Sequence, residues 1–247
     1  MEERSRPPGR GSTTLPPLVF AVALIFSPPH LPAQTGSVAG TVRLAGEVSP
    51  AEGVEVTSDQ GYCGRSIEPR DVVTEDGRVQ NAVVWIEGAE GEPEPRRRKL
   101  LNDGCRFDPG HLAAAVGDTL VVENRDSLLH NMNMKQTYTR GERAGETRPL
   151  GNFSLPLAGM SVERPDLIED PGVIEVTCDA HGWMEARVRV FDHPYFAVSG
   201  PEGKMAIGEV PPGTYRLHVR HPAVGSIERR VTVRTGERTR VDLTLEP

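Results

Sequence analysis

The stretch "EVTCDAHGWMEARVRV", residues 175–190, decides how this chain folds. Apolar and polar residues alternate on both sides of the central "DAHGW", which is the pattern of β-strands with one buried face. We therefore expect two strands joined by a short loop, with Cys178 and Met184 on the inward faces and His181 on the loop. The three side chains can converge on one point at the end of a β-sandwich.

The composition is that of a β protein. The 247 residues include 26 Gly and 22 Pro, which alternate with short Val-rich runs, and no long amphipathic helix pattern is present. The length suits one larger domain with a small one, or a single long β-domain. A formal net charge of -7 gives no indication of nucleic-acid binding.

Residues 1–34 have the pattern of a secretory signal peptide. Arg4, Arg6 and Arg10 precede an apolar run at residues 18–26, and small residues follow it. The run is too short to span a bilayer comfortably, and the alternative is an uncleaved anchor. We expect a periplasmic or secreted mature chain with no stable membrane span after cleavage.

Export determines how the three cysteines are interpreted. In an oxidising compartment two cysteines should pair and one is left over. Cys63, in "DQGYCGRS", and Cys105, in "NDGCRFDP", both lie in turn-like contexts, which favours their pairing. Cys178 is then the free thiol, and metal ligation is the leading reason for a free thiol in an exported protein.

A second candidate histidine lies in "VVENRDSLLHNMNM", residues 121–134. A strand ends near Glu123, a turn follows, and His130 comes after the turn. Two imidazoles, the Cys178 thiolate and the Met184 thioether form a ligand set that suits one copper ion, because sulfur ligands favour Cu(I) and imidazole suits both oxidation states. The alternative without a metal has a buried free cysteine, a solvent-exposed His181 and a core methionine.

The segments "NRDSLLHN" and "CDAHGWM" resemble the copper loops of cupredoxins, and their spacing is similar to that of the amicyanin type. The wider chain, residues 36–222, also resembles exported methylamine-utilisation-type, plastocyanin-like proteins through its "NAVVWI" strand and its Cys-x-Phe-x-Pro turn. The resemblance implies a Greek-key β-sandwich and single-electron transfer through copper. Two departures are Gly182, where the relatives usually have Pro, and a displaced His111, which we do not expect to be a ligand.

The resemblance also assigns roles to single residues. It implies that His130 and His181 are imidazole ligands, Cys178 the thiolate and Met184 the axial ligand. It further implies that Asn131 holds the ligand loops together by hydrogen bonds. Asn124 is a candidate for the same role, or an ordinary turn residue. Trp183 is either an apolar docking surface for electron entry or a partly buried loop aromatic.

The C-terminal part, residues 193–247, is organised differently. It is similar to the transthyretin-like module of carboxypeptidase regulatory domains, with strands on both sides of Pro211, Pro212 and Gly213 and a hairpin at residues 235–237. The predicted domains are therefore 1–34, 35–192 and 193–247. The stretch "GSVAGTVRLAGEVSP" adds a strand either to this module or to the copper domain. His218 and His221 are expected on the surface, and the basic run 95–99 is expected in a solvated loop.

Three classes of function follow from these observations. The preferred one is an electron carrier that exchanges electrons with an exported dehydrogenase or a c-type cytochrome. The second is a copper-binding or delivery protein without redox cycling, and the third is a structural or carbohydrate-binding β-module with a vestigial site. We do not expect an enzyme, because four protein ligands leave no open position for a substrate.

Overall fold

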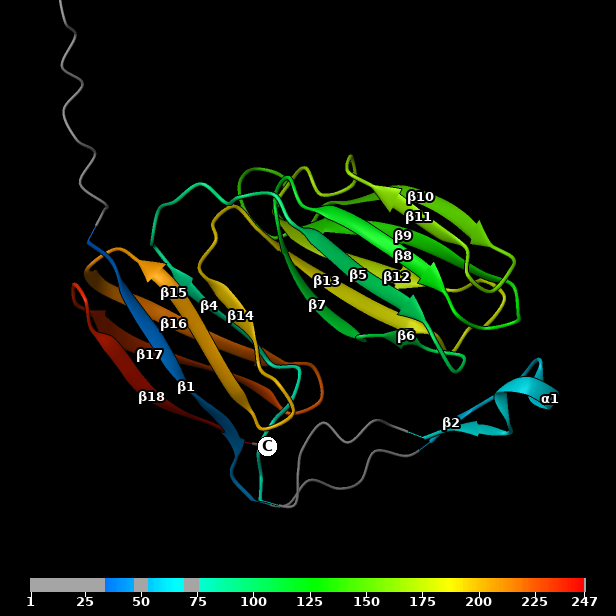
Figure 1. Ribbon diagram of the computed structural model, residues 1–247, viewed down its shortest axis with the longest axis horizontal. Helices are drawn as coiled ribbons and strands as arrows, with labels where there is room; N and C mark the ends of the chain where they lie inside the picture. The colour runs from blue at the N-terminus through cyan, green and yellow to red at the C-terminus, as the bar shows by residue number, and fades with distance from the viewer. Residues whose placement is uncertain (1–33, 47–52, 69–75, 247) are drawn as a thin grey trace, which may run out of the picture. The chain divides into compact units, whose positions relative to one another are not determined.

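The computed structural model describes residues 34–46, 53–68 and 76–246, and strands dominate these residues (Figure 1). The predicted signal peptide lies outside this part, except for its last position. In the described part of the chain the one helix is α1 (Gln60–Cys63), and no helix is long and apolar enough to cross a membrane. The prediction of an all-β fold is confirmed.

The first sandwich pairs a five-stranded sheet with a four-stranded sheet. The larger sheet contains, in spatial order, β10 (Thr147–Leu155), β9 (His130–Tyr138), β12 (Gly172–Thr177), β13 (Glu185–Phe191) and β7 (His111–Ala115). The smaller sheet contains β11 (Ser161–Arg164), β8 (Thr119–Asn124), β5 (Arg97–Asn102) and β6 (Phe107–Asp108). Side chains from both sheets form one core, with Leu100, Leu120, Met132 and Ile174 among the fully buried members.

Strands β12 and β13 form the antiparallel pair that the opening stretch predicts. Their register runs from Gly172 opposite Val190 to Thr177 opposite Glu185. Burial alternates along β12, as expected for a strand whose inward face joins the core. On its other edge β12 pairs with β9, so the loop after β12 lies beside the start of β9. This arrangement places Cys178 close to His130.

The second sandwich draws strands from both halves of the chain. One sheet contains β15 (Lys204–Val210), β1 (Gly36–Leu44) and β18 (Arg238–Leu245), and the other contains β14 (Phe196–Val198), β4 (Val83–Glu87), β16 (Gly213–His221) and β17 (Gly225–Val233). Strand β1 thus joins the C-terminal module, which answers the question that the sequence left open. Strand β4 also pairs there, although it falls inside the range predicted for the copper domain.

Strands β1 and β4 join the second sandwich because their apolar side chains are buried in its core. Within the described residues 193–246 there are five strands, which is little material for two covered sheets. The core of this sandwich includes Val38 and Val42 from β1 and Val84 and Ile86 from β4, all fully buried. The division of the chain at residue 192 therefore does not follow the sheets.

The prediction of a hairpin at residues 235–237 is wrong. Both flanking strands exist, but β17 pairs with β16, whereas β18 runs parallel to β1 from Ser37 opposite Arg238 to Leu44 opposite Leu245. The turn itself bonds to the start of β1, because the Gly236 N–H donates to the Thr35 carbonyl at 2.9 Å. The turn therefore carries the chain from one sheet to the other.

A small disulfide-bonded unit, which we call the covering segment, comprises residues 53–68. It contains β2 (Val54–Glu55), α1 and β3 (Ser66–Ile67), and β2 pairs with β3 (Figure 1). A disulfide joins Cys63 to Cys105 in the loop after β5, and Cys178 is the free cysteine among the described residues. The covering segment is thereby tied to the first sandwich.

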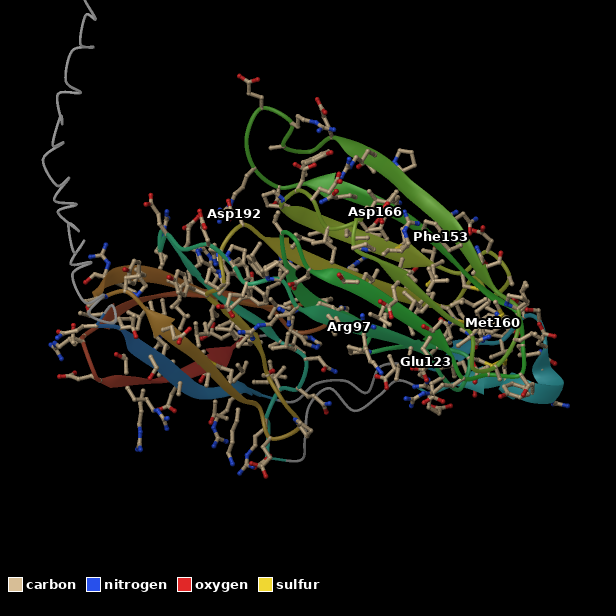
Figure 2. The ribbon with its side chains drawn as sticks, turned by 45° about the horizontal axis from the view of Figure 1, so that its top comes forward. Arg97, Glu123, Phe153, Met160, Asp166 and Asp192 are labelled. Atoms are coloured by element: carbon tan, nitrogen blue, oxygen red, sulfur yellow. A yellow bond between two sulfur atoms is a disulfide. The ribbon has the colours of Figure 1, made fainter. Side chains whose placement is uncertain are left out.

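Two minor expectations are wrong. Most of the basic run 95–99 belongs to strand β5, where Arg97 (labelled in Figure 2) pairs with Glu163 and Arg98 pairs with the buried Asp118 at 2.6 Å. His221 is buried, and its ring contacts that of His111. The sequence could not reveal these partners, because each comes from a distant part of the chain.

Candidate metal centre

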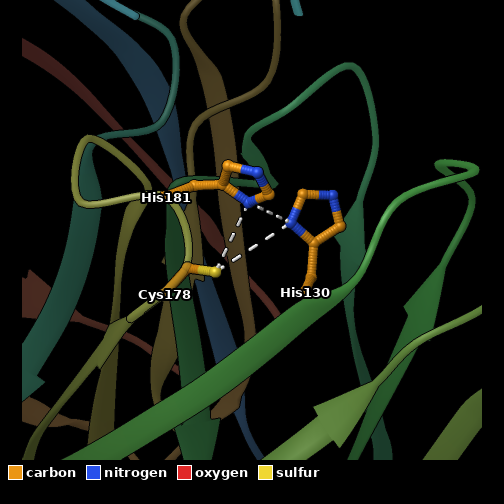
Figure 3. Close-up of side chains that lie close together, drawn as sticks. All are labelled: His130, Cys178 and His181. Carbon is orange, nitrogen blue, oxygen red and sulfur yellow. Dashed lines mark hydrogen bonds between the residues drawn. The ribbon is translucent and has the colours of Figure 1, made fainter. Parts of the chain in front are cut away.

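The candidate site lies where β9 begins and β12 ends. His130 is the first residue of β9, Cys178 follows β12 directly, and His181 lies on the loop that leads to β13 (Figure 3). The two Nδ1 atoms are 3.0 Å apart, and the Cys178 Sγ lies 3.7 Å from Nδ1 of His181 and 4.0 Å from Nδ1 of His130. Three of the four ligands expected from the sequence therefore meet at one point.

The spacing of these donor atoms fits a single metal ion. Nitrogen and sulfur donors bound at about 2.0–2.3 Å from one ion lie about 3–4 Å from each other. All three side chains are buried, with exposed fractions of 0% for His130, 1% for Cys178 and 1% for His181. Two imidazoles and a thiolate held together away from water are a donor set that suits copper.

The loop between the strands closes as a short turn. The Met184 N–H donates to the His181 carbonyl at 2.8 Å, and the Cys178 N–H donates to the Met184 carbonyl at 3.3 Å. These bonds fix the backbone on both sides of His181. Met184 is itself buried and belongs to the same core cluster as Cys178.

A carboxylate holds the outer nitrogen of each histidine. His130 Nε2 lies 2.9 Å from Asp126 Oδ2, and His181 Nε2 lies 3.0 Å from Asp59 Oδ2. A carboxylate on Nε2 favours the tautomer with the proton there, which leaves the Nδ1 lone pair free for a metal. Both rings are therefore oriented for coordination through Nδ1.

The surroundings of Asp126 keep it ionised. Burial raises its pKa, but hydrogen bonds from the backbone N–H groups of Cys105 and Gly104, together with that from His130, outweigh burial and hold the pKa below its usual range. Burial also lowers the pKa of His130, in spite of its bond to Asp126. The pair is then a carboxylate beside a neutral imidazole, which is the form that binds metal.

Asn131 connects the two loops that carry the ligands. Its Oδ1 accepts a hydrogen bond from the Asp179 N–H at 2.8 Å and lies 3.3 Å from the Cys178 Sγ. Its Nδ2 donates to Asn152 and to the Asp179 carboxylate. This side chain therefore fixes the position of the thiol relative to β9.

Asn124 organises the turn before His130. Its Nδ2 donates to the carbonyls of Leu128 and Leu155, both at 2.8 Å, and its Oδ1 accepts from the Asp126 N–H at 3.0 Å. The residue is fully buried at the end of β8. It thus acts as a turn residue, and the turn that it holds presents Asp126 to His130.

The covering segment closes the site from outside. Besides the bond from Asp59 to His181, its Ser58 Oγ donates to the Ala180 carbonyl at 3.3 Å, and its Tyr62 hydroxyl donates to Asp126 at 3.4 Å. Sequence reasoning missed both Asp59 and Asp126. Asp126 lies four residues before His130 in the quoted turn, so it could have been found, whereas Asp59 lies 122 positions from His181 in the chain and no local pattern connects the two.

Trp183 lies between the site and the disulfide. Its ring is half-buried and contacts the His181 ring at a centroid distance of 5.1 Å, and its Nε1 donates to the Cys105 carbonyl at 3.0 Å.

His111 was not expected to be a ligand. It lies on β7, outside the cluster of His130, Cys178 and His181.

The C-terminal part of the chain is similar to a known family model. Residues 173–246 match the model of a carboxypeptidase regulatory-like domain. The match covers β12 from its second residue and all of β13 in the first sandwich, as well as β14 to β18 of the second. Among the curated proteins none matches the chain.

Solved structures of copper proteins are similar to part of the chain. A variant of amicyanin in its Cu(I) form is 15% identical over 44% of this chain and 98% of that chain, with a TM-score of 0.29. An oxidised amicyanin variant is 17% identical over the same shares, with a TM-score of 0.30. A copper-containing nitrite reductase from Thermus scotoductus is 23% identical over 42% of this chain and 24% of that chain, with a TM-score of 0.30.

Replacing Asp59 tests whether the covering segment supports the metal centre. We expect Asp59→Asn to weaken copper binding by about tenfold or more, since loss of an outer carboxylate commonly costs about 10–100-fold in metal affinity. Asn tolerates the left-handed backbone of residue 59, where φ is 50°, so the substitution tests the carboxylate and not the turn. The measurement is competition for copper against a chelator of known affinity.

The matched control is Asp192→Asn, which removes a carboxylate from an exposed ion pair with Arg140. Equal copper affinities for Asp59→Asn and the unchanged chain would show that the carboxylate does not support His181.

Proposed function

We propose that the chain is an exported one-electron carrier in which His130, Cys178 and His181, with Met184 as a fourth ligand, would hold one copper ion. The observation that carries this proposal is the convergence of two imidazole Nδ1 atoms and one thiol within 4.8 Å of one another, all buried. A bound copper ion would supply one-electron chemistry by alternating between Cu(I) and Cu(II).

The protein's part is to hold the donors in one arrangement. Hydrogen bonds from Asp59 and Asp126 fix the two rings, and Asn131 fixes the loop that carries the thiol. The strands before and after that loop are paired along their length, which limits movement of the backbone. Rigid donors favour electron transfer, because little rearrangement accompanies a change in the charge of the bound ion.

Burial separates this proposal from the alternatives. A delivery protein must pass its metal to a partner, and this is hindered when every donor is buried beneath the covering segment. A vestigial site would have no reason to keep two buried histidines oriented by carboxylates. The proposal includes no catalytic role, since with Met184 as the fourth ligand no position for a substrate is left open.

We infer that redox partners dock where apolar side chains gather near the metal centre. Leu129, the residue before His130, is exposed, and so are Leu157 and Met160 (Met160 is labelled in Figure 2). The last two lie on a loop whose backbone bonds to Asn124, at the start of the turn that carries Leu129. We propose that these exposed apolar side chains form a docking surface for an exported dehydrogenase or a c-type cytochrome.

The visible spectrum tests the copper–thiolate bond. We expect the purified chain, titrated with Cu(II), to develop an intense thiolate-to-copper band at one equivalent, which a reductant bleaches and an oxidant restores. Cys178→Ser should lack the band completely, because a hydroxyl does not replace the thiolate. A spectrum without the band, from a chain with a free and reduced Cys178, would contradict the proposal and leave a Cu(I) binder or a structural module.

Reduction potentials of two methionine variants test whether Met184 is a ligand. We expect Met184→Leu to keep the thiolate band and to change the reduction potential, because a weak axial thioether tunes the potential of such sites. Met132→Leu is the matched control, since Met132 is also fully buried but belongs to the core of β9. Both substitutions nearly conserve volume, so each should cost less than about 1.5 kcal/mol of stability. Equal potentials in the two variants would argue against Met184 as a ligand.

A further inference from the structure

A cleft unrelated to the metal centre lies on the outer face of the larger sheet of the first sandwich. Its volume is about 440 Å³, which is within the range of small-molecule sites. Arg187 and Arg189 of β13, Glu175 of β12 and His111 of β7 line one side of it. Arg220, at the end of β16, lines it from the second sandwich.

The charges in this cleft are unbalanced. Three arginines face one carboxylate, that of Glu175, and this carboxylate lies 3.8 Å from Arg187 and only 3.0 Å from Lys135. Within residues 34–46, 53–68 and 76–246, neither Arg189 nor Arg220 has a carboxylate within ion-pair distance. By contrast, the nearby Arg140 is paired with Asp192 (labelled in Figure 2).

Arg189 is the central cation of the cleft. Its guanidinium lies 4.9 Å from the centre of the Trp85 ring, which holds it in place and leaves its N–H groups without an anionic partner. Burial, together with the positive charges of Arg220 and Arg140, lowers its pKa from the usual value. A partly buried cation beside like charges is unfavourable unless an anion joins it.

His111, which lines the cleft, and the buried His221, which contacts it, do not add positive charge. Burial and the neighbouring Arg187 lower the pKa of His111, and burial and His111 lower that of His221 to about 4. His221 packs edge-on against His111, and its buried Nε2 has no hydrogen-bond partner among the described residues. The cleft thus combines fixed arginine charges with a neutral polar wall.

We propose that this cleft binds a small oxyanion, a phosphate or carboxylate group, between the guanidinium groups of Arg189 and Arg220, with Arg187 at its edge. Guanidinium groups recognise both kinds of oxyanion through paired N–H donors, so the shared chemistry is the negatively charged planar or tetrahedral oxygen group. A ligand there contacts strands of both sandwiches. This proposal is independent of the copper site.

Calorimetric titration of the full chain at constant ionic strength tests the proposal, with inorganic phosphate in one arm and succinate in the other. We expect saturable binding of at least one anion. We also expect about tenfold or greater loss of affinity in Arg189→Gln and in Arg220→Gln, since a lost hydrogen bond to a charged group commonly costs at least that factor. Binding of phosphate alone or of succinate alone would identify the group that the cleft accepts.

The matched control is Arg230→Gln, which removes an exposed arginine from β17 and should leave the affinity unchanged. Arg220 is exposed, so its replacement keeps the test valid if Arg189→Gln fails to fold. The proposal is overturned if neither anion binds saturably. It is equally overturned if Arg220→Gln binds both anions as the unchanged chain does.

Discussion

The hydrogen-bonded register between β9 and β12 is the constraint on which the candidate metal centre depends. The two strands run antiparallel, with Thr177 opposite Asn133, so the end of β12 lies beside the beginning of β9. This pairing brings Cys178 next to His130, although 48 positions separate them in the chain. A slip of one residue would turn each side chain to the other face of the sheet and separate the donors.

Further interactions around Cys178 and His130 restrict the movement of the donor side chains. The short turn between Cys178 and Met184 fixes His181, and the carboxylates of Asp126 and Asp59 fix the ring nitrogens that point away from the thiol. Asp59 belongs to the covering segment, which the disulfide attaches to the loop after β5. Closing a loop of this length by a disulfide is worth about 4 kcal/mol in the chain-entropy description. Stability of the cover and orientation of His181 are therefore linked through one covalent bond.

The parts of the fold that the sequence predicted correctly have local causes. Alternation around "DAHGW" predicts β12 and β13, and the turn contexts of Cys63 and Cys105 predict the disulfide that is present. The exchange of β1 and β4 into the C-terminal sandwich has no local signal, because their alternation is the same whichever sheet receives them. The failed hairpin has a similar cause, since Gly236 permits a tight turn but does not decide which strand the chain joins afterwards.

Some residues of the candidate site could likewise be predicted from the sequence, and others could not. The spacing of one short motif indicated Cys178, His181 and Met184, whereas the role of Asn131 was implied by the resemblance to cupredoxins. Asp59 could not be inferred, because 122 positions separate it from His181 and only the folded covering segment brings them together. The arginine cleft was also hidden, since Arg187 and Arg189 look like ordinary solvent-facing residues of β13 until Arg220 is placed near them.

We propose that the chain holds its donors in position so that one electron moves with little rearrangement. Protein-film voltammetry of the copper-loaded chain tests this claim most directly. We expect a single reversible one-electron wave whose oxidative and reductive peaks stay close together as the scan rate rises. An irreversible wave, or loss of copper on oxidation or reduction, would mean that the donors must rearrange and would contradict the role of an electron carrier.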